Sequence, residues 1–131
     1  IIQLNTENRI KILIAEDNEI NLAALEKMVS LCGNYMIYPA RNGSEAIEVY
    51  IKEQPEIIFM DIQMPITNGF EAYKVIKEIS EKHGKRVRVI AITAYARQED
   101  QDNCMRIGMD DYIAKPFYFD QIMKILKKYT Q

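Results

Sequence analysis

The stretch IIFMDIQMP, residues 57–65, contains four consecutive apolar residues that end at an aspartate, Asp61. A short apolar run without polar alternation is typical of a strand that is buried on both faces of a parallel sheet. Asp61 would then lie at the carboxyl end of that strand. In open parallel α/β sheets, ligands bind at this edge. The run therefore predicts both the class of fold and the edge of the sheet where a functional site would lie.

Four further apolar runs are spaced along the chain, and patterns with helical periodicity separate them. Strands that alternate with amphipathic helices imply right-handed crossovers and one doubly wound α/β domain with helices on both faces. Asn42, with Glu45 three residues later, is a helix-start capping pattern, and Gly108 fits a left-handed helix end. The other apolar runs are residues 11–15 (KILIA), 35–40 (YMIYPA), 87–92 (VRVIAI) and 112–114 (YIA). The apolar stripes of the predicted helices are Leu22/Leu25/Val29/Cys32, Ala46/Ile47/Tyr50/Ile51, Ala72/Val75/Ile76/Ile79 and Ile122/Ile125/Leu126/Tyr129. A more polar helix is predicted at residues 97–107.

The composition limits the classes of protein to consider. The chain has 131 residues, enough for one domain, with 48% hydrophobic and 27% charged residues and a formal net charge of −2. This charge argues against a dedicated nucleic-acid binder, and apolar runs of at most four residues predict no membrane span. Cys32 and Cys104 lack metal-ligand spacing, and we expect small apolar side chains rather than a disulfide, which favours a reducing, cytoplasmic setting.

Chemically useful side chains follow the predicted strands at their carboxyl ends. Glu16 and Asp17 follow the first apolar run, Asp61 the third and Thr93 the fourth, and Lys115 lies at the end of the fifth. Because parallel strands present these ends at one edge, we expect the side chains to converge there. Crowded carboxylates favour a cation among them, and an all-oxygen ligand set suits Mg²⁺ or Mn²⁺. The pattern predicts a divalent metal site with one side open to a phosphoryl group.

Each residue alone has an ordinary structural explanation. Asp61 could form a turn, the adjacent Glu16 and Asp17 could cap a helix, Thr93 suits any strand, and Lys115 could be a surface charge. Their joint occurrence, in order and each at a strand end, favours function. A small phosphatase with an aspartate nucleophile is a rival, but it would need a second acid or base near Asp61.

The rival phosphatase lacks its second acid or base, and several other residues are expected to carry no chemistry. Position 63, two after Asp61, is Gln63 and cannot serve as the acid or base of a phosphatase. His83 lies in a polar turn, and Met60 and Met64, which flank Asp61, are expected to pack in the core. The basic run at 82–88 is expected to be a solvated helix end.

The runs ILIAEDNEIN (12–21), IIFMDIQMPITNGFEA (57–72), VIAITAYA (89–96) and GMDDYIAKPF (108–117) resemble the successive motifs of the receiver, or response-regulator, domain of two-component signalling. The resemblance covers residues 10–131 and leaves 1–9 as a linker. It implies a flavodoxin-like (βα)5 three-layer sandwich with a five-stranded parallel sheet in the order 2-1-3-4-5. The motifs EDNEIN and DIQMP are most similar to those of receiver domains in hybrid sensor histidine kinases.

The resemblance also implies a role for each site residue. Asp61 matches the aspartate that accepts a phosphoryl group. Asp17 matches the direct Mg²⁺ ligand and Glu16 its acidic neighbour, which acts through a water, while the backbone carbonyl of Gln63 would be a further ligand. Lys115 matches the lysine that pairs with the aspartate and later with a phosphoryl oxygen, and its bond to the following proline is commonly cis in the family.

The resemblance also implies which residues switch the conformation and which set the lifetime of the phosphoryl group. Thr93 matches the hydroxyl that follows the phosphoryl group, and Tyr112 matches the aromatic side chain that then turns inward. The surface of the fourth helix, fifth strand and fifth helix would change and could support a homodimer. Gln63 and Tyr95 match the positions that set the lifetime, and their bulk favours slow hydrolysis.

The implied partner is a histidine kinase or a histidine phosphotransfer domain, with no contact to nucleic acid or membrane by this domain. The chain begins at Ile1 rather than methionine, so we expect a piece of a longer hybrid kinase whose membrane anchorage stays open. A stand-alone single-domain response regulator and a phosphorylation-independent interaction module are the alternatives. The domain would catalyse its own phosphorylation and dephosphorylation; whether the parent is a protein-histidine kinase is left open.

Overall fold

The structure is a computed structural model that describes residues 9–94 and 97–130. The expected linker therefore lies, except for Arg9, outside the described residues. Strands and helices alternate strictly along the described chain. In order they are β1 (Lys11–Ala15), α1 (Glu19–Cys32), β2 (Met36–Ala40), α2 (Gly43–Glu53), β3 (Ile57–Asp61), α3 (Gly69–Lys82), β4 (Arg88–Thr93), α4 (Gln98–Arg106), β5 (Asp111–Ala114) and α5 (Phe119–Thr130).

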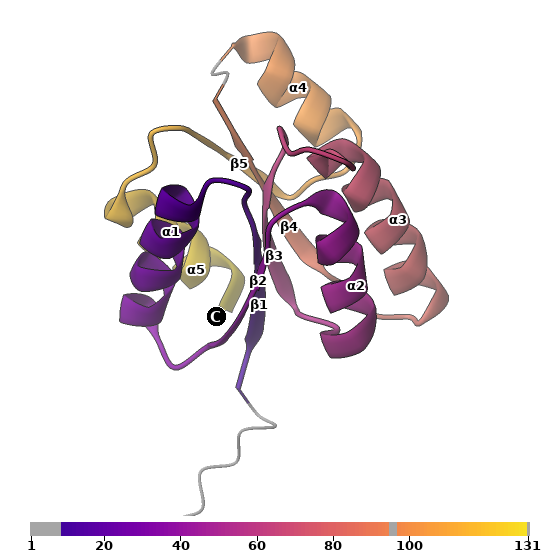
Figure 1. Cartoon of the computed structure of the whole chain (residues 1–131), viewed down its shortest axis with the longest axis horizontal. Helices are drawn as coiled ribbons and strands as arrows, with labels where there is room; N and C mark the ends of the chain where they lie inside the picture. The colour runs from indigo at the N-terminus through magenta and orange to yellow at the C-terminus, as the bar shows by residue number, and fades with distance from the viewer. Residues whose placement is uncertain (1–8, 95–96, 131) are drawn as a thin grey trace, which may run out of the picture.

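The strands form one parallel sheet in the order β2-β1-β3-β4-β5. Figure 1 shows the sheet between two helical layers, with α1 and α5 on one face and α2, α3 and α4 on the other. The doubly wound flavodoxin-like sandwich and the strand order 2-1-3-4-5 are both confirmed. The strand order reverses between β1 and β3, so the carboxyl ends of these two strands border the crevice where such folds bind ligands.

The apolar runs form strands because both sheet faces are covered. All five residues of β3 are buried, as are the last four of β1 and the last five of β4. Alternate side chains enter two separate cores. Leu13 and Ile58 pack with α2, α3 and α4, whereas Ile12 and Phe59 pack with α1 and α5. Each buried aliphatic side chain contributes about 1.5–3 kcal/mol, so the central strands are rigid supports for the residues at their carboxyl ends.

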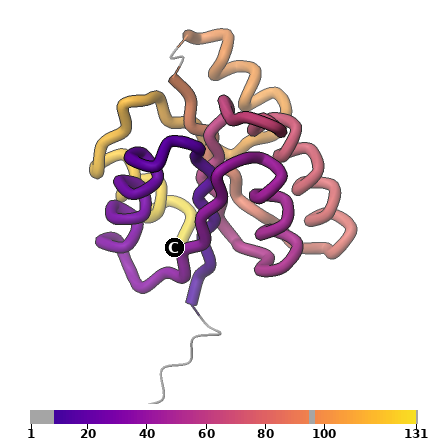
Figure 2. Tube along the Cα trace, viewed as in Figure 1, coloured from indigo at the N-terminus to yellow at the C-terminus, as the bar shows by residue number. Residues whose placement is uncertain are grey.

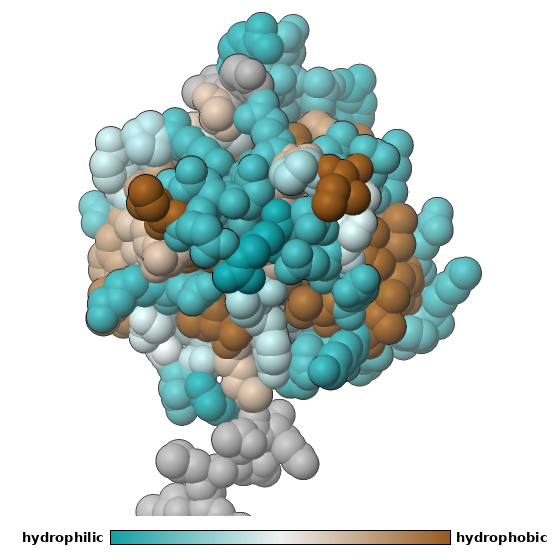
Figure 3. Space-filling model, viewed as in Figure 1, coloured by the Kyte–Doolittle hydropathy of each residue, from teal (hydrophilic) through white to brown (hydrophobic). Residues whose placement is uncertain are grey.

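The helical stripes predicted from sequence were partly too wide. Ile51 on α2 and Val75 on α3 are 55% and 39% exposed, and Figure 3 shows apolar surface over these two helices. A helix that packs on a sheet buries a limited arc, so stripe residues at its margin stay in solvent. Cys32 and Cys104 are both free, as expected. None of the described helices is long and apolar enough to cross a membrane.

The helix boundaries agree with the predicted local signals. The Asn42 side chain accepts a hydrogen bond from Glu45 N at the start of α2, which confirms the capping pattern. Gly108, just after α4, has a φ of 107°, a conformation that favours glycine and confirms the predicted helix end. Figure 2 shows the chain leaving β1, β3 and β4 at the same edge of the sheet, the upper one in this view.

Candidate functional site

Three carboxylates meet at the carboxyl edge of the sheet. Glu16 and Asp17 directly follow β1, and Asp61 is the last residue of β3, the strand paired with β1. One carboxylate oxygen from each lies within 4.8 Å of the others. Glu16 and Asp61 are 0% and 1% exposed, whereas Asp17 is exposed. The edge therefore joins two carboxylates held in the protein interior with one that reaches solvent.

Lys115 enters this cluster from the end of β5. Its Nζ lies 2.9 Å from Asp61 Oδ2 and 2.9 Å from Glu16 Oε1. Its backbone N donates to Thr93 O at 2.7 Å, which holds the residue beside the end of β4. The following bond to Pro116 is cis, as the resemblance implied. On the other side, Gln63 N donates to Asp61 Oδ1 at 3.0 Å, so each Asp61 oxygen has one donor.

Burial and charge shift the ionisation of these groups. Desolvation by burial, reinforced by the neighbouring Asp61 carboxylate, raises the pKa of Glu16 against the opposing effect of Lys115. For Lys115, burial lowers the pKa, but the neighbouring carboxylates of Glu16 and Asp61 outweigh this effect, and the net shift is upward. The single ammonium of Lys115 thus contacts two buried carboxylates, and one positive charge does not neutralise two negative ones.

The donor set fits a divalent cation. Among the residues that the structure describes, neither Glu16 oxygen accepts a hydrogen bond, although Lys115 Nζ is 2.9 Å from Oε1. An unsatisfied buried carboxylate is costly without a further positive group. Oxygen ligands alone, from Glu16, Asp17 and Asp61, suit Mg²⁺ or Mn²⁺ rather than zinc.

The structure also shows where three of the remaining predicted residues lie in the fold. Thr93 is the last residue of β4 rather than the residue after it, and it is buried. Tyr112 is half-buried on β5 and pairs in register with Ala91 of β4. The side chain of Gln63 is exposed. Tyr95 lies outside the described residues.

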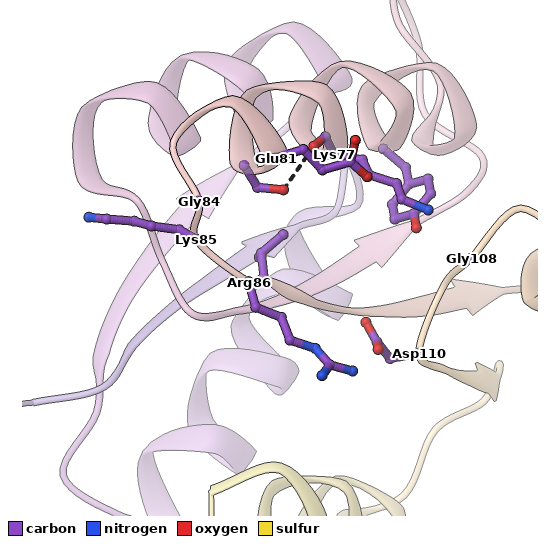
Figure 4. A pocket seen from close by; sticks show the side chains of 10 residues that line it. Lys77, Glu81, Gly84, Lys85, Arg86, Gly108 and Asp110 are labelled. Atoms are coloured by element: carbon purple, nitrogen blue, oxygen red, sulfur yellow. Dashed lines mark hydrogen bonds between the residues drawn. The ribbon is translucent and has the colours of Figure 1, made fainter.

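The structure also places the residues that we predicted to pack in the core or to lie in a polar turn. Met60 and Met64 are buried in the core, and His83 is exposed at the end of α3. A cavity of about 370 Å³ lies at the opposite, amino-terminal edge of the sheet. Figure 4 shows its basic side chains diverging: Lys85 points away from Lys77 and from Arg86. These cations do not converge on one ligand, so this cavity adds nothing to the site.

Sequence reasoning missed two features of the site. It assigned Glu16 to the metal but not to Lys115, which contacts both buried carboxylates. It also missed the contact between the start of α2 and Thr67, where Gly43 N donates to Thr67 O at 2.9 Å. The available signal was Gly43 itself, a glycine in the first turn of a helix, where close approach of another backbone is a common reason for glycine.

The response regulator receiver domain model matches residues 12–127, and the chain belongs to this family of two-component signalling domains. It is 33% identical over 118 residues to the polar-differentiation response regulator DivK of Brucella anthropi, covering 90% of this chain and 94% of that protein. It is 37% identical over 123 residues to hybrid signal transduction histidine kinase L of Dictyostelium discoideum, covering 91% of this chain but only 7% of that protein.

Two solved structures extend the comparison. The receiver domain of the sensor histidine kinase PA1611 from Pseudomonas aeruginosa, which has a magnesium ion in its active-site cleft, is 34% identical with a TM-score of 0.79 over 92% of this chain and 97% of that one. The receiver domain of Ssk1 in complex with the histidine phosphotransfer protein Ypd1, from Saccharomyces cerevisiae, gives 30% identity and a TM-score of 0.85 over 92% of this chain and 88% of that one.

Proposed function

We propose that Asp61 accepts a phosphoryl group from a phosphohistidine on a partner protein. The observation that carries this proposal is the environment of its carboxylate. Asp61 is buried, and Lys115 Nζ at 2.9 Å and Gln63 N at 3.0 Å each bind one oxygen. An aspartate fixed at both oxygens, at the edge where α/β sheets bind ligands, is oriented for attack rather than free to rotate.

In the proposed transfer, one Asp61 oxygen attacks the phosphorus atom of the phosphohistidine. The P–N bond breaks, its electron pair stays on the imidazole nitrogen, and Asp61 becomes an acyl phosphate. Such transfers have a loose transition state, so the protein contributes mainly position and positive charge. Lys115 is already in contact with Asp61 and can follow the new phosphoryl oxygens. Hydrolysis reverses the charge change, because water attacks phosphorus and releases phosphate and the Asp61 carboxylate.

A divalent cation, Mg²⁺ or Mn²⁺, would be held by Asp17 and Asp61, by Glu16 through a water, and by the backbone carbonyl of Gln63. When bound, it would offset negative charge on the phosphoryl oxygens. The support from this chain is the set of three carboxylates and the unsatisfied Glu16 oxygens. The magnesium ion in the related PA1611 receiver domain agrees with this assignment.

We further propose that Thr93 and Tyr112 convert phosphorylation into a change of surface. The Thr93 hydroxyl would move to bind a phosphoryl oxygen, and the Tyr112 ring would turn toward the space it leaves. The surface of α4, β5 and α5 would then change and could mediate a homodimer. We expect Gln63 and Tyr95, both bulky, to slow the approach of water to the acyl phosphate.

The proposed donor is a histidine kinase or a histidine phosphotransfer domain. The related Ssk1 receiver domain was solved in complex with such a phosphotransfer protein. We favour a hybrid sensor histidine kinase as the parent, with residues 10–131 as its receiver domain and 1–9 as linker. The DivK relative, which the chain matches over 94% of that protein's length, supports a stand-alone regulator as the second candidate.

The test is the intact mass after incubation with Mg²⁺ and acetyl phosphate. We expect one phosphoryl adduct on the wild type, and none without metal or in Asp61→Asn. Asp120→Asn, a change at an exposed carboxylate on α5, is the matched control and should be labelled normally. If a phosphorylated histidine partner also leaves the wild type unlabelled, the proposal is wrong and an interaction module becomes the better explanation.

A further inference from the structure

The first turn of helix α2 contacts the β3–α3 loop, residues 62–68, which lies directly after the proposed phosphoacceptor. Gly43 N donates to Thr67 O at 2.9 Å, and the hydroxyls of Ser44 and Thr67 are 3.2 Å apart. A Cβ atom on Gly43 would lie only 2.0 Å from Thr67 O, a backbone atom that cannot rotate away. No side chain larger than hydrogen fits at position 43 unless the loop moves.

The α2 side of this contact is rigid. Asn42 Oδ1 accepts a hydrogen bond from Glu45 N at 2.8 Å, and Asn42 Nδ2 donates to Glu45 Oε2 at 3.1 Å. Glu45 Oε1 also accepts a hydrogen bond from Arg41 N at 3.3 Å. This reciprocal capping satisfies donors that a helix start otherwise leaves free. The first turn of α2 is therefore held in one conformation where it contacts the loop.

On the other side of the contact, the β3–α3 loop follows Asp61 directly in the chain. Gly69 N donates to Ile62 O at 2.9 Å, and a Cβ on Gly69 would lie 2.4 Å from Asp61 O, so the two ends of the loop are in close contact. Between them, Ile66 has a φ of 70° beside a tight turn from Thr67 N to Pro65 O. Positive φ is unfavourable for a β-branched residue. Ile66 is 81% exposed, so its own packing does not impose this backbone.

We propose that Gly43 and Ser44 are positioning residues for the chemistry at Asp61. By holding Thr67, they keep the β3–α3 loop in the conformation that places Gln63 N on Asp61 Oδ1, and they thereby also position the Gln63 carbonyl that we propose as a metal ligand. This inference rests on the proposed function. It adds helix α2, which contributes no side chain to the acidic cluster, to the elements that determine phosphorylation rate and metal affinity.

The variants separate the two parts of the contact. Gly43→Ala forces the loop away from α2, whereas Ser44→Ala and Thr67→Val remove the hydroxyl pair with little change in shape. Thr67→Ser keeps the hydroxyl and is the rescue variant. The measurements are the Mg²⁺ dissociation constant by calorimetry, the rate of phosphorylation by acetyl phosphate at saturating Mg²⁺, and deuterium exchange at the Gln63 amide.

We expect Gly43→Ala to slow phosphorylation about tenfold or more, because displacements near 1 Å have such effects. Ser44→Ala and Thr67→Val should slow it about threefold, the loss of one ordinary hydrogen bond. Mg²⁺ binding should weaken and exchange at Gln63 should accelerate in the same order, and Thr67→Ser should restore wild-type values. If Gly43→Ala does not fold, the hydroxyl variants alone decide the question.

Two controls measure stability effects away from the site. Gly84→Ala places a side chain at a φ of 65° with no atom within 4 Å, and Ser30→Ala removes a hydroxyl bonded to Lys27 O on α1. Both should change the melting temperature and leave the site unchanged. The inference is overturned if Gly43→Ala and the hydroxyl variants change only the melting temperature and leave Mg²⁺ affinity, phosphorylation rate and Gln63 exchange at wild-type values. If the wild type accepts no phosphoryl group, the proposed function fails, but metal affinity and Gln63 exchange still test the positioning.

Discussion

Replacing Lys115 with methionine tests how much the buried carboxylates depend on one cation. Lys115 Nζ is 2.9 Å from an oxygen of Glu16 and of Asp61, and both carboxylates are about 1% exposed. At this distance each attraction amounts to about 6 kcal/mol at an effective dielectric constant of about 20. Desolvation of the ammonium offsets much of it, and breaking a buried ion pair costs about 3–5 kcal/mol. We expect Lys115→Met to lower the unfolding free energy of the metal-free protein by this amount at neutral pH.

The loss should depend on pH through Glu16. Its pKa is raised in the folded protein, first by burial and then by Asp61, while Lys115 opposes the rise. A raised folded-state pKa gives stability that is complete below the unfolded-state value and is lost as pH rises through the folded-state value. Without Lys115 the pKa of Glu16 rises further, so the variant loses more stability than the wild type as pH increases. The cost of Lys115→Met should therefore be smaller near pH 4 than at neutral pH and above.

Urea denaturation at several pH values, with and without Mg²⁺, measures these effects. Mg²⁺ supplies positive charge to the same carboxylates, so it should stabilise Lys115→Met more than the wild type. Lys128→Met is the matched control, because Lys128 pairs with Asp111 at 3.3 Å on an exposed surface, and it should cost much less. A loss that is the same at every pH and unaffected by Mg²⁺, or no larger than that of the control, would refute the reasoning.

Three further predictions concern single contacts. Glu16→Gln should raise the metal-free unfolding free energy at neutral pH, because it removes an unsatisfied buried charge, and weaken Mg²⁺ binding about tenfold or more by calorimetry. Tyr129→Phe should lower the unfolding free energy in urea by about 1–2 kcal/mol, since its single hydroxyl hydrogen is shared between Asp110 O at 2.9 Å and Asp111 Oδ2 at 3.0 Å. Ile66→Gly should raise that free energy by about 0.5–1 kcal/mol, because it relieves a positive φ and loses little packing.

The fold could be predicted from sequence because its decisive signals are local. The run at 57–60 is continuously apolar since β3 is covered on both faces, and the Asn42–Glu45 cap lies within one turn of the helix that it starts. The errors occur where tertiary packing decides. Whether Ile51 or Val75 is buried depends on the rotation of α2 and α3 against the sheet, which periodicity alone does not specify.

The site was predictable in its residues but not in its contacts. Strand-end placement is enough to bring Glu16, Asp61 and Lys115 to one edge, because parallel strands share that edge. That Lys115 lies equally near both carboxylates, at 2.9 Å from each, depends on side-chain conformations and on the path of the chain after β5. The Gly43–Thr67 contact joins the first turn of α2 to the β3–α3 loop, between residues that are 24 positions apart, and no local pattern encodes such a pairing.

The charges of the site explain why a hydroxyl is needed at position 93 in the proposed mechanism. If all three carboxylates and the ammonium were charged, they would leave two negative charges, which one divalent cation would balance. Phosphorylation replaces the single charge of the Asp61 carboxylate with about two on the phosphoryl group. The site then holds about one negative charge that neither Lys115 nor the cation neutralises. Thr93 is buried at the end of the neighbouring strand, and in the proposed mechanism its hydroxyl would be the uncharged donor for this charge. Because this donor would be needed only after phosphorylation, movement of the Thr93 hydroxyl would report the phosphorylated state.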